Sequence, residues 1–79
     1  MFIVEVLMTA FNDDTTVDTQ NRSTRYFNTI DDAMADYDSL YTALTRQARI
    51  TTLWDVFVIS IFGGSELLKM QTIRCEREK

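Results

Sequence analysis

The chain begins with a segment whose hydrophobic pattern is typical of a strand. Residues Phe2–Phe11 are rich in β-branched and aromatic residues and contain neither glycine nor proline. Every second residue from Phe2 to Ala10 is apolar, whereas the alternate set includes Glu5 and Thr9. Because successive side chains of a strand point to opposite faces, we expect the wholly apolar set to face the core.

A polar segment follows, in which Val17 is the only apolar residue between Asn12 and Asn21. Asn and Asp side chains bond to their own backbone in turns, so the sequence predicts a turn at Asn12–Asp14. Residues Arg22–Phe27 are then expected to return as a short polar strand at a sheet edge, where charged side chains discourage unwanted pairing.

The next segment has the spacing of an amphipathic helix. Its apolar residues recur at intervals of three and four and form one stripe of about four turns, at Ile30, Ala33, Met34, Tyr37, Leu40, Tyr41 and Leu44. Thr29 is a suitable N-cap, and Asp32 lies three residues later, as in a variant of the capping box.

A second apolar segment, Thr51–Phe62, predicts a strand in which both faces are largely apolar. Strands of this kind are usually central in a sheet and covered on both sides. Gly63 and Gly64 predict a two-residue hairpin turn, and Ser65–Cys75 the strand that returns from it.

These elements predict one α+β domain over residues 1–79, with the order ββαββ. We expect a four-stranded antiparallel sheet in the order 2-1-3-4, with the helix packed on one face. One helix covers only one face, yet the sequence supplies apolar residues for two, and an uncovered apolar face often marks a binding surface. The hypothesis is an oligomer interface, or homodimer contact, formed by Ile3, Leu7, Phe11, Phe57 and Ile59. The competing explanation is that the 12–21 loop, or a bulge that shifts the strand parity, covers this face.

The composition excludes several kinds of chemistry. The chain has no histidine and one cysteine, so it cannot by itself form a Ser-His-Asp triad, a Cys-His pair or a zinc site. Asp13, Asp14 and Asp18 lack the spacing and the glycine of an EF-hand calcium loop. An enzyme would depend on carboxylates such as Asp55 and Glu66. We therefore predict a protein that is not an enzyme and uses no metal or cofactor.

The charge of the chain is unevenly distributed. The net charge is −4, with eight acidic and two basic residues in positions 1–40 but four acidic and six basic in positions 41–79. A negative protein repels phosphate backbones, which argues against direct nucleic-acid binding and favours a partner protein with a basic surface. The candidate contact residues are Asp13, Asp14, Asp18, Asp32, Asp36 and Asp38. Turn formation and capping of the helix dipole are the alternative roles for these carboxylates.

The sequence also bears on location. No apolar run reaches the roughly 18–20 residues that a membrane helix needs. With a lone cysteine and no export signal, the expected location is the cytoplasm.

A resemblance rests on the stretch R-Y-F-N-T-I-D-D-A-M-A-D-Y-D-S-L, Arg25–Leu40, preceded by an I-V-E-V strand and followed by an apolar strand and a G-G hairpin. This pattern resembles small bacteriophage-encoded accessory proteins, some of which inhibit host machinery and include anti-CRISPR proteins. The resemblance implies a short, acidic, non-enzymatic inhibitor that binds a host protein, such as a CRISPR–Cas component, in the host cytoplasm. It covers most of the chain and assigns no site residues.

Overall fold

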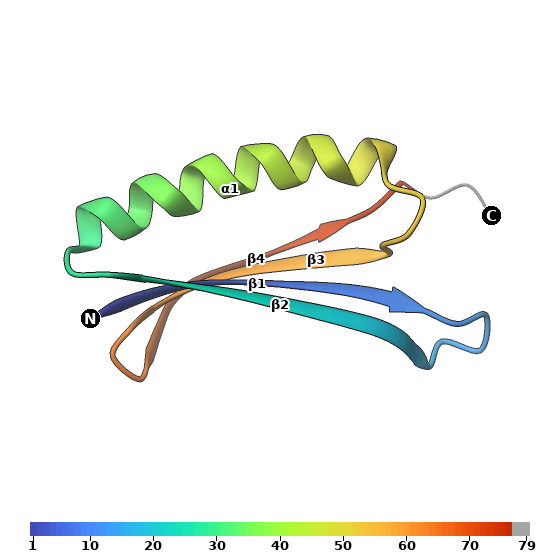
Figure 1. Ribbon diagram of the computed structural model, residues 1–79, viewed down its shortest axis with the longest axis horizontal. Coiled ribbons are helices and arrows are strands. Elements are labelled where there is room, and N and C mark those ends of the chain that lie inside the picture. Colours follow the sequence, from blue (N-terminus) through green and yellow to red (C-terminus); the bar gives the residue numbers. More distant parts are fainter. Residues whose placement is uncertain (77–79) are drawn as a thin grey trace.

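The part of the chain that the structure describes forms one sheet and one helix (Figure 1). The structure is a computed structural model that describes residues 1–76. The elements in chain order are β1 (Phe2–Phe11), β2 (Val17–Phe27), α1 (Ile30–Ile50), β3 (Val56–Gly63) and β4 (Glu66–Arg74). The predicted α+β class and ββαββ order are confirmed.

The four strands form one antiparallel sheet in the predicted order, β2-β1-β3-β4. The two hairpins turn at opposite ends of the molecule, and α1 carries the chain from the edge strand β2 to the central strand β3 (Figure 1). Gly63 still pairs with Glu66, so the tight turn contains Gly64 and Ser65 rather than Gly63 and Gly64. Gly64 has φ 61°, which matches the first central residue of a type II′ turn.

The helix begins where the sequence predicts. Thr29 is the N-cap, and its Oγ1 accepts a hydrogen bond from the backbone N–H of Asp32 at 3.2 Å. With 21 residues, α1 continues beyond the expected last apolar position, Leu44, because Ala48 lies one turn further on the same buried face. The helix is about 31 Å long, so it runs along most of the 41 Å molecule.

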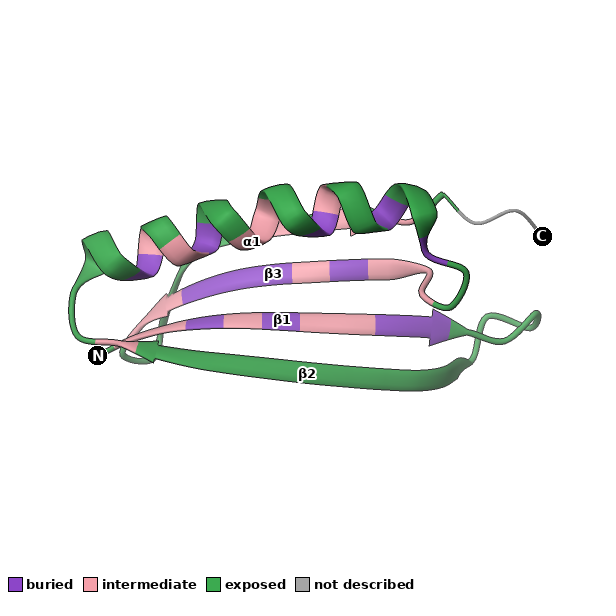
Figure 2. Ribbon diagram, turned by 45° about the horizontal axis from the view of Figure 1, so that its top comes forward, coloured by how far each residue is buried: buried purple, intermediate pink, exposed green. Residues whose placement is uncertain are grey.

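The core lies between α1 and one face of the sheet (Figure 2). The apolar set of β1 faces this core, as predicted, with Val4 and Val6 buried. The remaining buried members come from β3 and the helix: Phe57, Ile59, Ile61, Ala33, Tyr37, Leu44 and Ala48. Tyr37 also donates a hydrogen bond from its hydroxyl to Oε1 of Gln71 on β4, at 2.8 Å.

Two strand starts differ from the prediction by five residues, whereas the other strand boundaries agree to within one residue. β2 starts at Val17 instead of Arg22, because pairing with β1 provides the backbone hydrogen bonds that its polar side chains do not favour. β3 starts at Val56 instead of Thr51, since Thr51 Oγ1 accepts the backbone N–H groups of Leu53 and Trp54 and forms a turn after the helix. Apart from Phe27, β2 is exposed along its whole length, as expected for an edge strand.

Candidate functional site

The face of the sheet that α1 does not cover carries exposed apolar side chains. We call it the open face. Strand pairing arranges its side chains in four rows, each in the order β2, β1, β3, β4. The rows are Tyr26, Ile3, Phe62 and Leu67; Thr24, Glu5, Ser60 and Met70; Arg22, Leu7, Val58 and Thr72; and Gln20, Thr9, Val56 and Arg74.

The open face has a largely apolar centre and a mixed margin. Its centre consists of β1 and β3, where Ile3, Leu7, Val56, Val58 and Phe62 are only partly buried, and its polar members are Glu5, Thr9 and Ser60. Three large apolar side chains on the flanking strands are more exposed: Tyr26 at 65%, Met70 at 55% and Leu67 at 48%. Polar residues occupy most of the other flanking positions, and this division into centre and rim is typical of protein interfaces.

Part of the predicted oligomer interface is wrong. Ile3 and Leu7 lie on the open face, and Phe11, 38% exposed, continues it at the end of β1. Phe57 and Ile59 are fully buried under α1 on the other face. Because both faces of β3 are apolar, its residue pattern did not determine which set the helix covers.

The alternative that a loop covers this face is also wrong. The turn between β1 and β2 spans only residues 12–16, and residues 17–21 are paired in the sheet. The two register shifts lie near strand ends, at Ala10/Phe11 and Ile61/Phe62, so neither turns the central apolar side chains away from solvent.

The candidate acidic residues do not converge on one surface. Asp13, Asp14 and Asp18 lie in or next to the β1–β2 turn, whereas Asp32 lies at the start of α1, at the opposite end of the molecule (Figure 1). Asp38 is exposed further along the helix. The predicted set is therefore divided between two regions.

Two of these carboxylates have intramolecular partners. Asp36 Oδ1 accepts from Arg25 Nη1 at 2.7 Å, and the Asp36 side chain is only 14% exposed. Asp14 Oδ1 accepts from the hydroxyl and the backbone N–H of Thr16, at 2.6 and 3.1 Å. Hydrogen bonds from Thr16, the hydroxyl first, lower the pKa of Asp14 below its ordinary value. The ion pair between Arg25 and Asp36 joins β2 to α1, whereas the hydrogen bonds of Asp14 stay within the β1–β2 turn.

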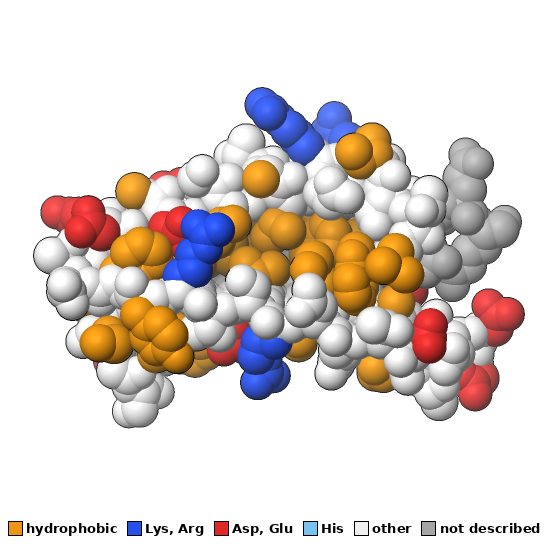
Figure 3. Space-filling view, viewed as in Figure 1, with side chains coloured by type: hydrophobic (Ala, Val, Ile, Leu, Met, Phe, Trp, Pro, Cys, Tyr) orange, Lys and Arg blue, Asp and Glu red, His pale blue; other side chains and the backbone are white. Residues whose placement is uncertain are grey.

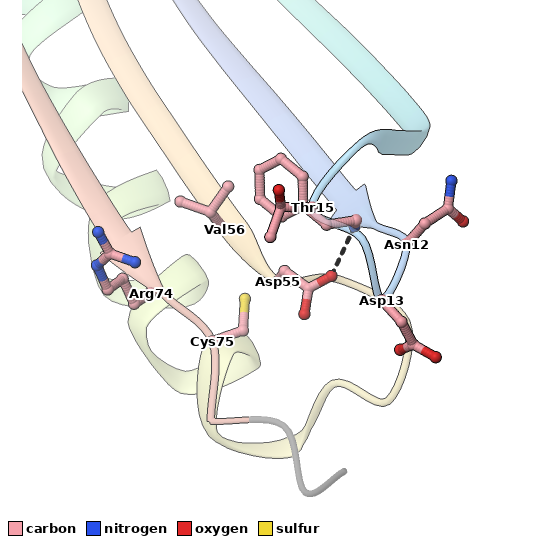
Figure 4. Close-up of a pocket in the computed structure, with 8 residues that line it drawn as sticks. Asn12, Asp13, Thr15, Asp55, Val56, Arg74 and Cys75 are labelled. Carbon is pink, nitrogen blue, oxygen red and sulfur yellow. Dashed lines mark hydrogen bonds between the residues drawn. The ribbon is translucent and has the colours of Figure 1, made fainter.

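An open hollow of about 500 Å³ lies where β1, β3 and β4 meet the turn, lined by Phe11, Asn12, Asp13, Thr15, Asp55, Val56, Arg74 and Cys75 (Figure 4). Asp55 occupies a structural position in it, because its Oδ2 accepts the backbone N–H of Phe11 at 2.7 Å. Its backbone N–H donates to Thr9 and its carbonyl accepts from Cys75, both at 2.9 Å. Asp55 therefore connects three strands.

The carboxylate pair considered for acid–base chemistry is not assembled. Asp55 precedes β3, whereas Glu66 lies beyond its other end, where it pairs with Gly63. Within residues 1–76, no group of three or more His, Cys, Asp or Glu residues is placed to hold a metal ion. Nor is any helix in that range long and apolar enough to cross a membrane.

A second apolar surface lies on the helix side. Figure 3 shows a band of hydrophobic side chains between α1 and β2, crossed by a basic side chain that has an acidic one beside it. A groove of about 190 Å³ in this region is lined by Val4, Val6, Met8, Leu40 and Leu44, with Ser23 and Arg25 at its side. Two of the apolar residues that line this groove, Val4 and Val6, are themselves buried.

Sequence reasoning missed several residues of the open face. Val58 and Phe62 belong to it instead of Phe57 and Ile59, and Tyr26 and Met70 extend it onto the edge strands. Counting back from the hairpin at Gly64 gives the β3–β4 register only as far as Phe62 with Leu67, because a register shift follows at Ile61/Phe62. It also does not show which face of β3 the helix covers. The polar surroundings of Tyr26 gave no signal that it joins an apolar row.

Comparison with known proteins adds no family. No protein-family model, curated protein or solved structure matches the chain.

Proposed function

We propose that the protein is a non-catalytic protein-binding module whose contact surface is the open face. The observation that carries this proposal is an apolar centre on β1 and β3 that neither the helix nor the β1–β2 turn covers. Contiguous exposed apolar surface of this kind is rare on proteins that act alone. The separation of Asp55 from Glu66 supports a binding role over catalysis.

The resemblance to small phage-encoded inhibitors supports a host protein as the target of this module, such as a CRISPR–Cas component in the host cytoplasm. The exposed carboxylates Asp13, Asp18, Asp32 and Asp38 would meet basic groups on that protein. Asp36 takes no part in this contact, because Arg25 already neutralises it. The open face itself favours a second candidate, a homo-oligomer joined through this surface.

Site-specific photo-crosslinking tests whether the open face contacts protein. A photoreactive residue at Leu7 should give a covalent adduct with another polypeptide chain in cells that express the protein. The matched control is Thr42, which is exposed on the outer surface of α1 and should give no adduct. Adducts at Thr42 with none at Leu7 would exclude the open face as the contact surface.

A further inference from the structure

We infer that a second copy of this chain occupies the open face, so that the protein is a homodimer of two sheets packed face to face. This inference rests on the proposed function, because it requires the open face to be a protein contact. It adds the identity of the occupant and the arrangement of the two copies.

The first argument is size. A ten-residue strand extends about 33 Å and four strands span about 19 Å, so the open face covers roughly 600 Å² in projection. Its accessible area is larger, because side chains stand out from the sheet, and stable interfaces bury about 800 Å² on each partner. A stable partner must therefore cover nearly the whole face. A second copy offers a surface of the same length, width and twist.

The second argument is charge. Of the charged residues in the four rows, Glu5 already pairs with Arg22, Oε1 to Nε at 3.2 Å, and Arg74 lies at the margin. The face thus carries one negative and two positive charges, although the whole chain carries −4. The acidic excess lies elsewhere, so two copies can meet here without bringing carboxylates together. A basic partner surface, by contrast, would meet only one carboxylate on this face, that of Glu5, and Arg22 already neutralises it.

The third argument is self-complementarity. A two-fold axis parallel to the strands places β1 over β3 of the second copy and β2 over β4, and it keeps each row opposite the same row. Ile3 then faces Phe62 of the second copy, and Leu7 faces Val58. The charged residues face uncharged ones, with Glu5 opposite Ser60, Arg22 opposite Thr72 and Arg74 opposite Gln20. Ile3, Leu7, Val58 and Phe62 thus meet apolar residues, Val56 and Met70 face Thr9 and Thr24, and no like charges are directly opposite.

This arrangement also accounts for the exposed side chains on the edge strands. Tyr26 of one copy would pack on Leu67 of the other at both ends of the first row, and Met70 would pack beside Thr24. The carboxylates at Asp13, Asp32 and Asp38 lie outside the four rows. They would remain available to a further protein, now presented twice.

Sedimentation equilibrium over a dilution series of the full chain tests the inference. The parent should have the mass of a dimer at chain concentrations above about 100 μM. Two variants place like charges at the centre of the face, Leu7→Glu/Val58→Glu and Leu7→Lys/Val58→Lys. Each should raise the dimer dissociation constant at least about 100-fold, because four like charges would meet across the axis. The matched control, Thr42→Glu on the outer surface of the helix, should leave the dissociation constant unchanged.

Mixing the two variants separates loss of the contact from loss of the fold. An equimolar mixture of the acidic and basic variants should form a 1:1 heterodimer, since opposite charges then face each other. Circular dichroism of each variant should show the helix and sheet of the parent. A parent that stays monomeric up to about 1 mM would overturn the inference. Variants that dimerise as tightly as the parent would overturn it too, as would folded variants that form no heterodimer.

The photo-crosslinking experiment at Leu7, combined with the sedimentation of the parent, separates the dimer from the proposed function. Photo-adducts at Leu7 with the mass of two chains support both the dimer and the binding role of the open face. Adducts with a different polypeptide, together with a monomeric parent, overturn the dimer and retain the proposed function. Absence of any adduct at Leu7 overturns both.

Discussion

The buried hydroxyl of Tyr37 provides a quantitative test of how the helix is attached to the sheet. Tyr37 is fully buried, and its hydroxyl donates to Gln71 Oε1 at 2.8 Å, while Lys69 Nζ lies 5.0 Å from the ring centroid. Replacing Tyr37 with Phe removes the hydroxyl and keeps the packing of the ring. A neutral hydrogen bond contributes about 1 kcal/mol net, with a range of about 0.5–1.5. Gln71 is only half-buried, so water can partly replace the lost partner, and we expect a loss of about 0.5–1 kcal/mol.

Urea denaturation followed by circular dichroism, at equal chain concentrations, measures this loss. In thermal denaturation of a domain of this size, a loss of 1 kcal/mol in the free energy of unfolding corresponds to a decrease in Tm of roughly 4–8 °C. The matched control is Tyr41→Phe, which removes the hydroxyl of a half-buried tyrosine one turn further along the same helix. Equal losses in both variants, or no loss at Tyr37, would show that the bond to Gln71 does not stabilise the fold. A double-mutant cycle with Gln71→Met should give a coupling free energy of about 0.5–1 kcal/mol.

The same hydroxyl predicts a pH dependence. Burial raises the pKa of Tyr37 above its ordinary value of 10.0, with smaller effects from Tyr41 and Asp38. As the pH rises, the unfolded chain therefore loses this proton before the folded protein does. The contribution of the protonated Tyr37 hydroxyl to the free energy of unfolding is complete below about pH 10. It is lost as the pH rises through the elevated pKa of Tyr37. Tyr37→Phe should reduce the alkaline decrease in stability, and identical slopes in parent and variant would contradict the assignment.

Two further predictions concern the core and the turn. Ile59→Ala should cost about 2–5 kcal/mol in chemical denaturation because Ile59 is fully buried, whereas Ile50→Ala, at a position 73% exposed, should change stability by less than about 0.5 kcal/mol. Equal costs would contradict the placement of Ile59 under the helix. By NMR titration, the pKa of Asp14 should lie below its ordinary value of 3.8, and Thr16→Val should raise it towards that value by removing the hydroxyl donor. No difference between parent and variant would show that the hydroxyl does not bond to the carboxylate in solution.

Local patterns predicted most of the fold because they agreed with one another. The alternation in β1, the N-cap at Thr29 and the apolar stripe of α1 each follow from side chains within a few residues. The sheet order followed because the most apolar strands occupy the centre. Boundaries were less accurate where partners far along the chain decide them, as in β2, whose polar residues form a strand because β1 pairs with them.

The site was predicted less well, for reasons visible in particular residues. Apolar residues on both sides of β3 gave no basis for choosing Val58 over Phe57 as the exposed set. Asp36 looked like a free surface carboxylate, since nothing local indicates that Arg25, eleven residues earlier, reaches it from a neighbouring strand. Such contacts depend on how the helix lies over the sheet, and that arrangement is set by the packing of the whole core.

The strand order has a consequence for how the chain folds. Both hairpins pair residues that are close in the chain. The residues that β1 and β3 pair are much further apart, from 47 positions for Thr9 with Val56 to 61 positions for Phe2 with Gly63. Closing so long a loop is entropically costly, so the pairing of the two central strands should limit the rate of folding. Until it occurs, the most apolar strands of the protein both have an unpaired edge, which is the form most prone to aggregate.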